Sequence, residues 1–204
     1  FYNESKNGAI PPSPIVSCLG RLKDVNKTVP AHFQKSDSVI LMIGERKDEL
    51  GGSVYYSLFN ELGANIPKPN FEEVKNQIFA LTDCIDDGMV LSCHDIADGG
   101  IASALAEMTF GNEIGCNVKI KSGLASDKIL FSETGGFVLE VSLEKLDKIK
   151  SAFLIYGLDT FEIGTTGGSH IKLNGVVKIS VNKTKESWTT GLRDKLSTTE
   201  TQST

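Results

Sequence analysis

The 204-residue sequence contains few cysteines, and their spacing argues against a metal site or a disulfide framework. No two of the four have the Cys-x-x-Cys spacing, with two residues between them, that is typical of zinc sites. Four in 204 is also well below the density of small secreted disulfide scaffolds. We therefore expect no metal site, and interpret the cysteines as reduced, small apolar residues of a cytoplasmic protein. They are Cys18, Cys84, Cys93 and Cys116.

The sequence also lacks long apolar runs and an excess of positive charge. No apolar stretch approaches the ~18 residues that a membrane span requires. Lysine and arginine number 21 against 26 aspartates and glutamates, a formal net charge of -5. Because nucleic acids and anionic lipids bind clustered basic residues, we expect neither a nucleic acid nor a membrane as partner. The chain has neither an initiator Met nor a signal-peptide pattern, so we interpret it as cut from a longer protein.

Residues 1–36 have the composition of a connector. Pro11, Pro12 and Pro14 exclude a helix there. Residues 15–22 are apolar enough for one strand, and residues 25–36 are polar. We therefore predict a strand and linker from a preceding domain over residues 1–36, a main domain over 37–196, and a Ser/Thr-rich disordered tail over 197–204.

The main domain combines helical and strand patterns. Residues 39–44 form an apolar run typical of a strand buried on both faces. Asn70 followed by Glu73 is a capping-box pattern, and apolar residues then recur at helical spacing to residue 85. This mixed, non-alternating order predicts an α+β fold, a mixed sheet with helices packed on it. Further helices are expected over 53–62, 101–110, 143–153 and around 188–196, and strands over 89–93, 116–120, 129–131, 137–141, 161–163, 170–173 and 176–181.

One candidate binding turn joins an expected strand to an expected helix. It contains His94, Asp95, Asp98, Gly99 and Gly100. Free amides at a helix start favour an anion, and the glycines allow a nucleotide phosphate to approach the backbone. The alternative is structural: Asp98 caps the helix, Asp95 orients the loop, and His94 is a half-buried histidine with its hydrogen bonds satisfied.

A second candidate turn lies between two apolar segments. It contains Ser132, Glu133, Thr134, Gly135 and Gly136. Its hydroxyls and amides suit a phosphate, and Glu133 suits ribose hydroxyls or a metal, although a Gly-rich connection with a capping serine has the same pattern. The charged loop with Arg46 and Lys47 is a weaker candidate that we expect to be exposed. No spacing indicates nucleophilic catalysis, a Walker loop or a complete dinucleotide fingerprint, so we name no catalytic residue.

Several motifs in order resemble the phosphoribosylformylglycinamidine synthases. Residues 1–4 (FYNE) and 9–16 (AIPPSPIV) resemble the end of the second ATP-binding half of these enzymes. Residues 41–45 (LMIGE) and 48–53 (DELGGS) resemble the opening of their last domain, of the AIR synthase-related C-terminal type. HDIADGGIA at 94–102, LAE at 105–107 and LFSE at 130–133 follow in the same order. The resemblance covers about residues 1–196.

The resemblance implies an ATP-dependent C–N ligase of the amidotransferase type in purine biosynthesis. Such enzymes use ATP and magnesium to convert formylglycinamide ribonucleotide and glutamine-derived ammonia to formylglycinamidine ribonucleotide. The implied partners are the remainder of the synthase and a glutaminase subunit or domain. The family's Gly-Asn-x-Ser motif, catalytic histidines and main magnesium carboxylates would precede Phe1, so we expect the chain to be inactive alone.

This sequence departs from the family at the second turn. The usual pattern is Ser-Glu-Ser-x-Gly-Arg, whereas Phe137 stands here where the arginine is expected, which removes any phosphate contact from that side chain. Two alternatives stay open: a domain of another ATP-binding synthetase, such as AIR synthase or selenophosphate synthetase, and a non-catalytic small-molecule binding module. Each interpretation that uses both turns requires them to lie together at the rim of the sheet.

Overall fold

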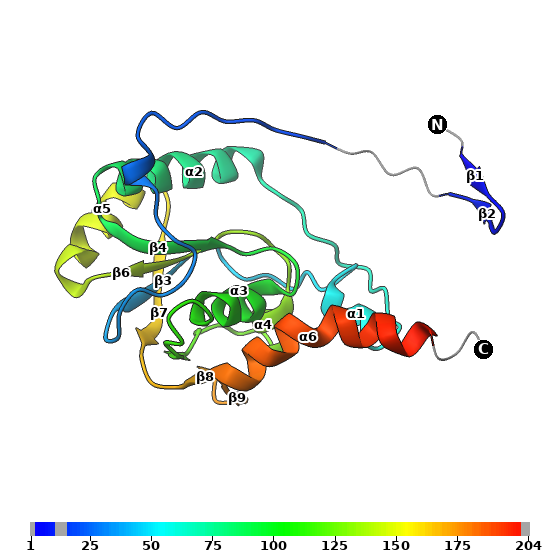
Figure 1. Cartoon of the computed structure of the whole chain (residues 1–204). Coiled ribbons are helices and arrows are strands. Elements are labelled where there is room, and N and C mark those ends of the chain that lie inside the picture. The colour runs from blue at the N-terminus through cyan, green and yellow to red at the C-terminus, as the bar shows by residue number, and fades with distance from the viewer. Residues whose placement is uncertain (1–2, 11–15, 201–204) are drawn as a thin grey trace.

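The structure, a computed structural model, describes residues 3–10 and 16–200. Strands β1 (Glu4–Ser5) and β2 (Gly8–Ala9) form a small hairpin, and an extended connector with one 3-10 turn, η1 (Val25–Lys27), leads to the main body (Figure 1). Residues 16–22 are exposed and form no strand, so that part of our prediction is wrong. An apolar segment becomes a strand only where a neighbouring strand completes its hydrogen bonds. Residues 1–2 and 11–15, which we assigned to the strand and linker of a preceding domain, lie outside the described residues.

The main body is a mixed β-sheet between two layers of helices, which confirms the α+β prediction (Figure 1). All neighbouring strands of this sheet are antiparallel except β5 and β8, which are parallel. The strand order is β4-β6-β3-β7-β5-β8-β9. The strands are β3 (Val39–Ile43), β4 (Val90–Asp95), β5 (Cys116–Val118), β6 (Phe137–Val141), β7 (Thr160–Thr166), β8 (His170–Leu173) and β9 (Val177–Ser180).

The helices divide between the two faces of the sheet. On one face α2 (Phe71–Asp86) contacts α5 (Leu146–Ile155), which follows the 3-10 turn η2 (Leu143–Lys145). On the other face α3 (Gly100–Thr109) contacts both α4 (Ser126–Phe131) and α6 (Val181–Glu200). A single turn, α1 (Val54–Ser57), precedes the long connection to α2. None of the helices within the described residues is both long and apolar enough to cross a membrane.

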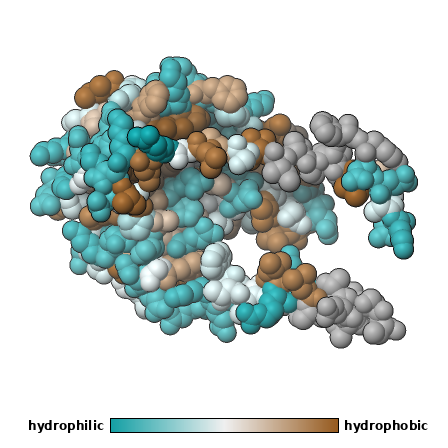
Figure 2. Space-filling view, turned by 45° about the horizontal axis from the view of Figure 1, so that its top comes forward, coloured by the Kyte–Doolittle hydropathy of each residue, from teal (hydrophilic) through white to brown (hydrophobic). Residues whose placement is uncertain are grey.

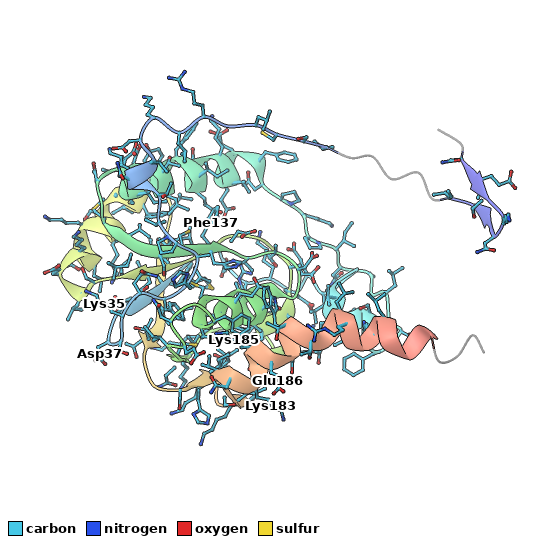
Figure 3. All side chains as sticks on the ribbon, viewed as in Figure 1. Lys35, Asp37, Phe137, Lys183, Lys185 and Glu186 are labelled. Carbon is cyan, nitrogen blue, oxygen red and sulfur yellow. The ribbon has the colours of Figure 1, made fainter. Side chains whose placement is uncertain are left out.

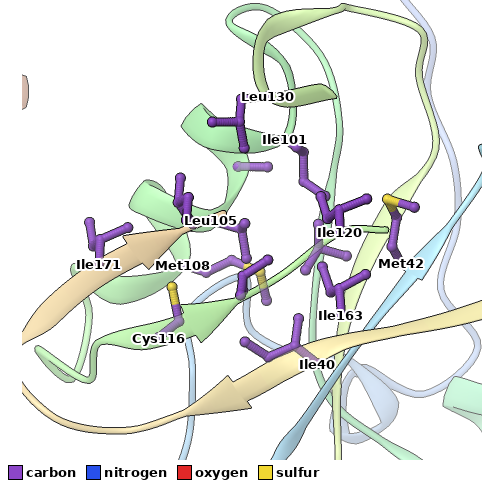
Figure 4. Packing of buried hydrophobic residues seen from close by; sticks show 14 of the residues in the cluster. Ile40, Met42, Ile101, Leu105, Met108, Cys116, Ile120, Leu130, Ile163 and Ile171 are labelled. Carbon is purple, nitrogen blue, oxygen red and sulfur yellow. The ribbon is translucent and has the colours of Figure 1, made fainter. Parts of the chain in front are cut away.

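Strand β3 forms the centre of the hydrophobic core because both of its faces are covered. Ile40 and Met42 pack in the cluster under α3 and α4, which Figure 4 shows with Ile101 and Leu105. The alternate residues of β3 pack on the other side with residues of α2 and α5, such as Phe153. The predicted continuous apolar strand is therefore confirmed. Phe33 of the expected linker is fully buried in the α3-side cluster, so the connector is packed onto the domain from that point.

Several local predictions can be compared directly with the structure. The capping pattern is confirmed, because the Asn70 side chain accepts a hydrogen bond from the Glu73 amide at the start of α2. Asn174 and Gly175 have φ values of 50° and 73° in the β8–β9 turn, as an Asn-Gly hairpin requires. The helix predicted over residues 53–62 is shorter than expected and spans only Val54–Ser57. The last extends to Glu200, so residues 197–200 are helical where we expected a disordered tail, and 201–204 lie outside the described residues.

The predicted strand over residues 129–131 is wrong, because these residues end helix α4. Three consecutive apolar residues carry no periodicity that distinguishes a strand from a buried helical turn. Ile129 and Leu130 are buried in the cluster on the α3 side of the sheet. The apolar run therefore reflects helix packing rather than strand pairing.

We expect the buried thiols to resist alkylation in the folded protein. Burial raises the pKa of Cys93 and of Cys116 to about 12 and that of Cys84 to about 11, from an ordinary 9.0. Since the thiolate is the nucleophile, iodoacetamide at pH 8 should modify exposed Cys18 first, and all four thiols only after unfolding. Unfolded thiols ionise near pH 9, whereas the folded ones stay protonated, so stability should fall as pH rises above 9. Equal labelling rates for all four thiols in the folded chain would contradict this prediction.

Candidate functional site

The two candidate turns lie side by side at one edge of the sheet. Strands β4 and β6 are antiparallel neighbours in which Asp95 pairs with Phe137, the residue labelled at the start of β6 in Figure 3. The first turn therefore leaves the sheet where the second enters it. The Ile96 amide donates to the Gly136 carbonyl oxygen at 2.8 Å. The geometric condition for a shared site is met, while ligand binding by these residues stays a prediction.

Glu133 joins the two helix starts that border this edge. One of its carboxylate oxygens, Oε1, accepts hydrogen bonds from the Gly99 amide at 2.8 Å and from the Val54 amide at 2.9 Å. These amides lie at the start of α1 and at the start of α3, and at the second of these we expected a phosphate to find free donors. In this structure the protein's own carboxylate accepts from both, so an incoming anion would compete with Glu133 there.

The remaining polar residues of the first turn have mainly structural contacts. The His94 ring, largely buried, contacts the Asp95 carbonyl through Nδ1 at 2.7 Å and the Glu107 carboxylate through Nε2 at 2.9 Å. The structural interpretation of His94 is therefore supported. The expected helix cap at Asp98 is wrong, because the cap residue is Gly99, with a φ of 77° and no capping side chain. Asp95 and Asp98 are exposed.

The glycines of both turns are required by the protein's own close packing. A Cβ atom on Gly100 would lie 2.7 Å from the Leu130 carbonyl oxygen, and one on Gly136 would lie 2.2 Å from the Ile43 carbonyl oxygen. Both glycines have positive φ values, 67° and 107°. Their presence is thus explained without a ligand. Gly135 differs, because a Cβ atom added there would meet no other atom within 4 Å and would face open space.

The loop before α1, which we expected to be exposed, is packed onto the second turn. The Glu49 amide donates to the Oγ of fully buried Ser132 at 3.4 Å. Arg46 is only 4% exposed, and its Nη2 donates to the carbonyl oxygens of Gly135 and Gly44. Burial lowers the pKa of Arg46 to about 10, against a raising effect of nearby Glu49. No periodic signal in the sequence indicates this burial, so the expectation of an exposed Arg46 is wrong.

A polar groove begins beside the second turn. Its inner part is lined by residues of three segments that are distant in the sequence, including Gly44, Lys47, Lys68 and Thr134. Gly44, Glu45, Asn70 and Glu73 also line an adjoining hollow of about 390 Å³ that extends to α5. No group of three or more metal-ligating side chains occurs within residues 3–10 and 16–200. The groove is lined by charged and amide side chains such as Lys47, Lys68 and Asn70, which suit a polar ligand.

We expect Glu133→Ala to destabilise the chain more than Asp98→Ala. Loss of the Glu133 carboxylate leaves two amides at helix starts without their acceptor, which should lower the free energy of unfolding by about 1–2 kcal/mol. Asp98 makes no capping hydrogen bond, so its replacement should change stability by less than about 0.5 kcal/mol. Urea unfolding of both variants measures the difference. Equal losses would show that Glu133 does not hold the two starts together.

Comparison with known proteins finds a family that matches this chain. The family described as AIR synthase related protein, C-terminal domain, matches residues 35–175. Phosphoribosylformylglycinamidine synthase subunit PurL of Methanothrix thermoacetophila is 34% identical over 201 residues, which cover 95% of this chain and 26% of that protein. The same subunit of Thermoplasma volcanium is 35% identical over 199 residues, 94% of this chain and 26% of that protein. The chain thus spans about a quarter of the length of these relatives.

Solved structures show the same fold at lower sequence identity. Phosphoribosylformylglycinamidine synthase II of Thermotoga maritima has a TM-score of 0.66 at 16% identity, covering 79% of this chain and 28% of that one. The hydrogenase maturation protein HypE of E. coli has a TM-score of 0.53 at 18% identity, covering 75% and 51%. Since the family match covers more than half of the sequence, the chain belongs to the AIR synthase related proteins, as a C-terminal domain of that family.

Proposed function

We propose that this chain is the C-terminal part of a phosphoribosylformylglycinamidine synthase. That enzyme forms formylglycinamidine ribonucleotide from formylglycinamide ribonucleotide, ATP and glutamine-derived ammonia, in the cytoplasm. The observation that carries the proposal is similarity over 95% of the chain to a protein named PurL, at 34% identity. The likeness to HypE is limited to the fold, at 18% identity, and so favours no other synthetase.

The proposed role of the chain is to shape and support a nucleotide site rather than to carry out the chemistry. Structures of Thermotoga maritima PurL have been solved with ATP and with ADP. Phosphoryl transfer depends on positioning and on neutralising phosphate charge, for which magnesium is the usual ion. The two turns and the polar groove lie at one rim of the sheet, where a neighbouring domain can complete a site. The chain's own residues would then contribute amides, hydroxyls and the Arg46 guanidinium.

Exposed apolar side chains support a larger assembly. Trp188, Leu192 and Leu196 recur every four residues on α6 and are at least 62% exposed. Other large apolar side chains are exposed in the segment that follows α1, and Figure 2 shows apolar residues interrupting the polar surface. Contiguous exposed apolar surface is typical of contact regions. The proposed partners are the rest of the synthase and, through it, a glutaminase subunit or domain.

A chimera tests this proposal. The matching quarter of Thermoplasma volcanium PurL would be replaced by this chain, and formylglycinamidine ribonucleotide would be measured with ATP, magnesium and ammonium salt. We expect product from the chimera and none from the 204-residue chain alone. The relative without its matching quarter is the negative control. Product formation by the chain alone, or a cooperatively folded chimera that forms none, would refute the proposal.

A further inference from the structure

The sequence contains two Asn-Gly pairs, and each lies at the turn of a β-hairpin. Asn7-Gly8 lies where the turn between β1 and β2 ends, and Asn174-Gly175 lies in the turn between β8 and β9. Glycine has no Cβ atom to hinder the approach of its backbone nitrogen to the preceding side-chain amide. A Cβ atom added to Gly8 or to Gly175 would meet no other atom within 4 Å. Both glycines are therefore equally open, and a difference in reactivity must come from the two asparagines.

Asn7 lies in a hairpin that has little support from the rest of the chain. Strands β1 and β2 share only two residue pairs, and residues 3–10 are all exposed. An isolated two-stranded hairpin is at best marginally stable in water, so this turn opens often. The Asn7 backbone amide donates to Ser5 Oγ at 3.2 Å, whereas its side-chain amide has no hydrogen-bond partner within residues 3–10 and 16–200. The side chain is therefore free to rotate toward the Gly8 nitrogen.

Asn174, in contrast, is held through both its backbone and its side chain. Its Oδ1 accepts from the Ile120 amide at 2.7 Å, and its own amide donates to the Val118 carbonyl oxygen at 2.9 Å. The turn is closed by the Val176 amide, which donates to the Leu173 carbonyl oxygen at 3.0 Å. Strands β8 and β9 share four residue pairs and belong to the seven-stranded sheet. Rotation of the Asn174 side chain toward the next nitrogen would thus break its contact with the segment that follows β5.

We propose that Asn7 is a site of spontaneous deamidation in this chain, and that the fold protects Asn174 from the same reaction. The Gly8 nitrogen loses its proton and bonds to the side-chain carbon Cγ of Asn7. The bond from Cγ to Nδ2 then breaks, and ammonia leaves with the proton. Water opens the resulting five-membered imide by breaking one of its two ring C–N bonds. One water is consumed and one ammonia is released, so solvent is the only co-reactant.

The reaction changes both the charge and the backbone at position 7. Opening one ring bond leaves aspartate, and opening the other leaves isoaspartate, in which the main chain runs through the former side chain and gains one carbon atom. Either product adds a carboxylate to a chain whose formal net charge is already -5. Isoaspartate lengthens the turn, so the pairing of Ser5 with Gly8 is lost. This chemistry needs no step of the reaction proposed for the parent protein, and so goes beyond that function.

Incubation of the 204-residue chain at neutral pH and physiological temperature tests the proposal. Peptide mapping by mass spectrometry measures the deamidated fraction at positions 7 and 174 over time. We expect Asn7 to react at least ~10-fold faster than Asn174 in the folded chain, because Asn174 must first lose its hydrogen bonds. In guanidinium chloride, which removes these contacts, the two rates should agree within ~3-fold. Asn7→Gln is the matched control: its imide ring would have six members and closes less readily, so the change at position 7 should disappear.

The possible outcomes separate the fold from the local sequence. Equal rates in the folded chain overturn the proposal, as does faster reaction of Asn174. A ~10-fold difference that persists in guanidinium chloride refutes protection by the fold, because the neighbouring sequence would then set both rates. Isoaspartate, detected with a methyltransferase specific for it, supports the imide route, whereas aspartate as the sole product refutes it. Deamidation and amidine formation are measured separately, so failure of one leaves the other standing.

Discussion

Replacing Glu140 by alanine is expected to lower the free energy of unfolding by about 3 kcal/mol, since buried donors that lose a charged acceptor are costly. Glu140 lies in β6 with no exposed surface. Its carboxylate accepts from the Gln34 amide at 2.7 Å, the Lys35 amide at 3.1 Å and the Ser92 hydroxyl at 2.8 Å. Figure 3 shows Lys35 where the connector meets the sheet. The substitution would thus also release the connector from the sheet.

Two variants identify the carboxylate as the cause. Glu140→Gln keeps one oxygen acceptor, so it should recover about half of the loss. Glu186→Ala removes an exposed glutamate from α6 and should change stability by less than about 0.5 kcal/mol. Urea unfolding monitored by circular dichroism measures all three variants. A loss for Glu140→Ala no larger than that for Glu186→Ala would contradict the role of Glu140.

Elements with strong local signals were predictable from the sequence. Helix α2 was expected over residues 71–85 and extends over Phe71–Asp86, because its cap and its apolar period are both encoded within the segment. Strand β3 was predictable from its apolar run, since burial on both faces needs no alternation. The α+β class followed from the order of such segments, even though one expected strand was a helix.

The rest could not be predicted because it depends on contacts between distant residues. Nothing near Arg46 in the sequence shows that its guanidinium meets the Gly135 carbonyl 89 residues later. Glu133 reaches the amides of Val54 and Gly99, which are 79 and 34 residues away. The sequence identified two polar, glycine-rich turns, and the interpretation that uses both required them to lie at the same rim, where the structure has them. Which of their donors already have acceptors became visible only in three dimensions.

Gly136→Ala is expected to be among the most damaging single-methyl additions, lowering the free energy of unfolding by about 3 kcal/mol or more. Gly136 has a φ of 107°, which alanine adopts with strain, and its Cβ would lie 2.2 Å from the Ile43 carbonyl oxygen. Ile43 ends β3 and pairs with Phe137 of β6, so the obstacle is backbone held in the sheet. The chain can relieve the clash only by moving the second turn away from β3.

Gly135→Ala is the control that measures the cost of backbone strain without a steric clash of the added Cβ atom. Gly135 also has a positive φ, 87°, but a Cβ there would meet no atom within 4 Å. Its replacement should therefore cost only the conformational strain, about 1–2 kcal/mol. The difference between the two variants, measured by urea unfolding, reports how tightly the second turn is held against β3. Equal losses would mean that the turn moves away easily and that the Ile43 carbonyl oxygen does not hold it in place.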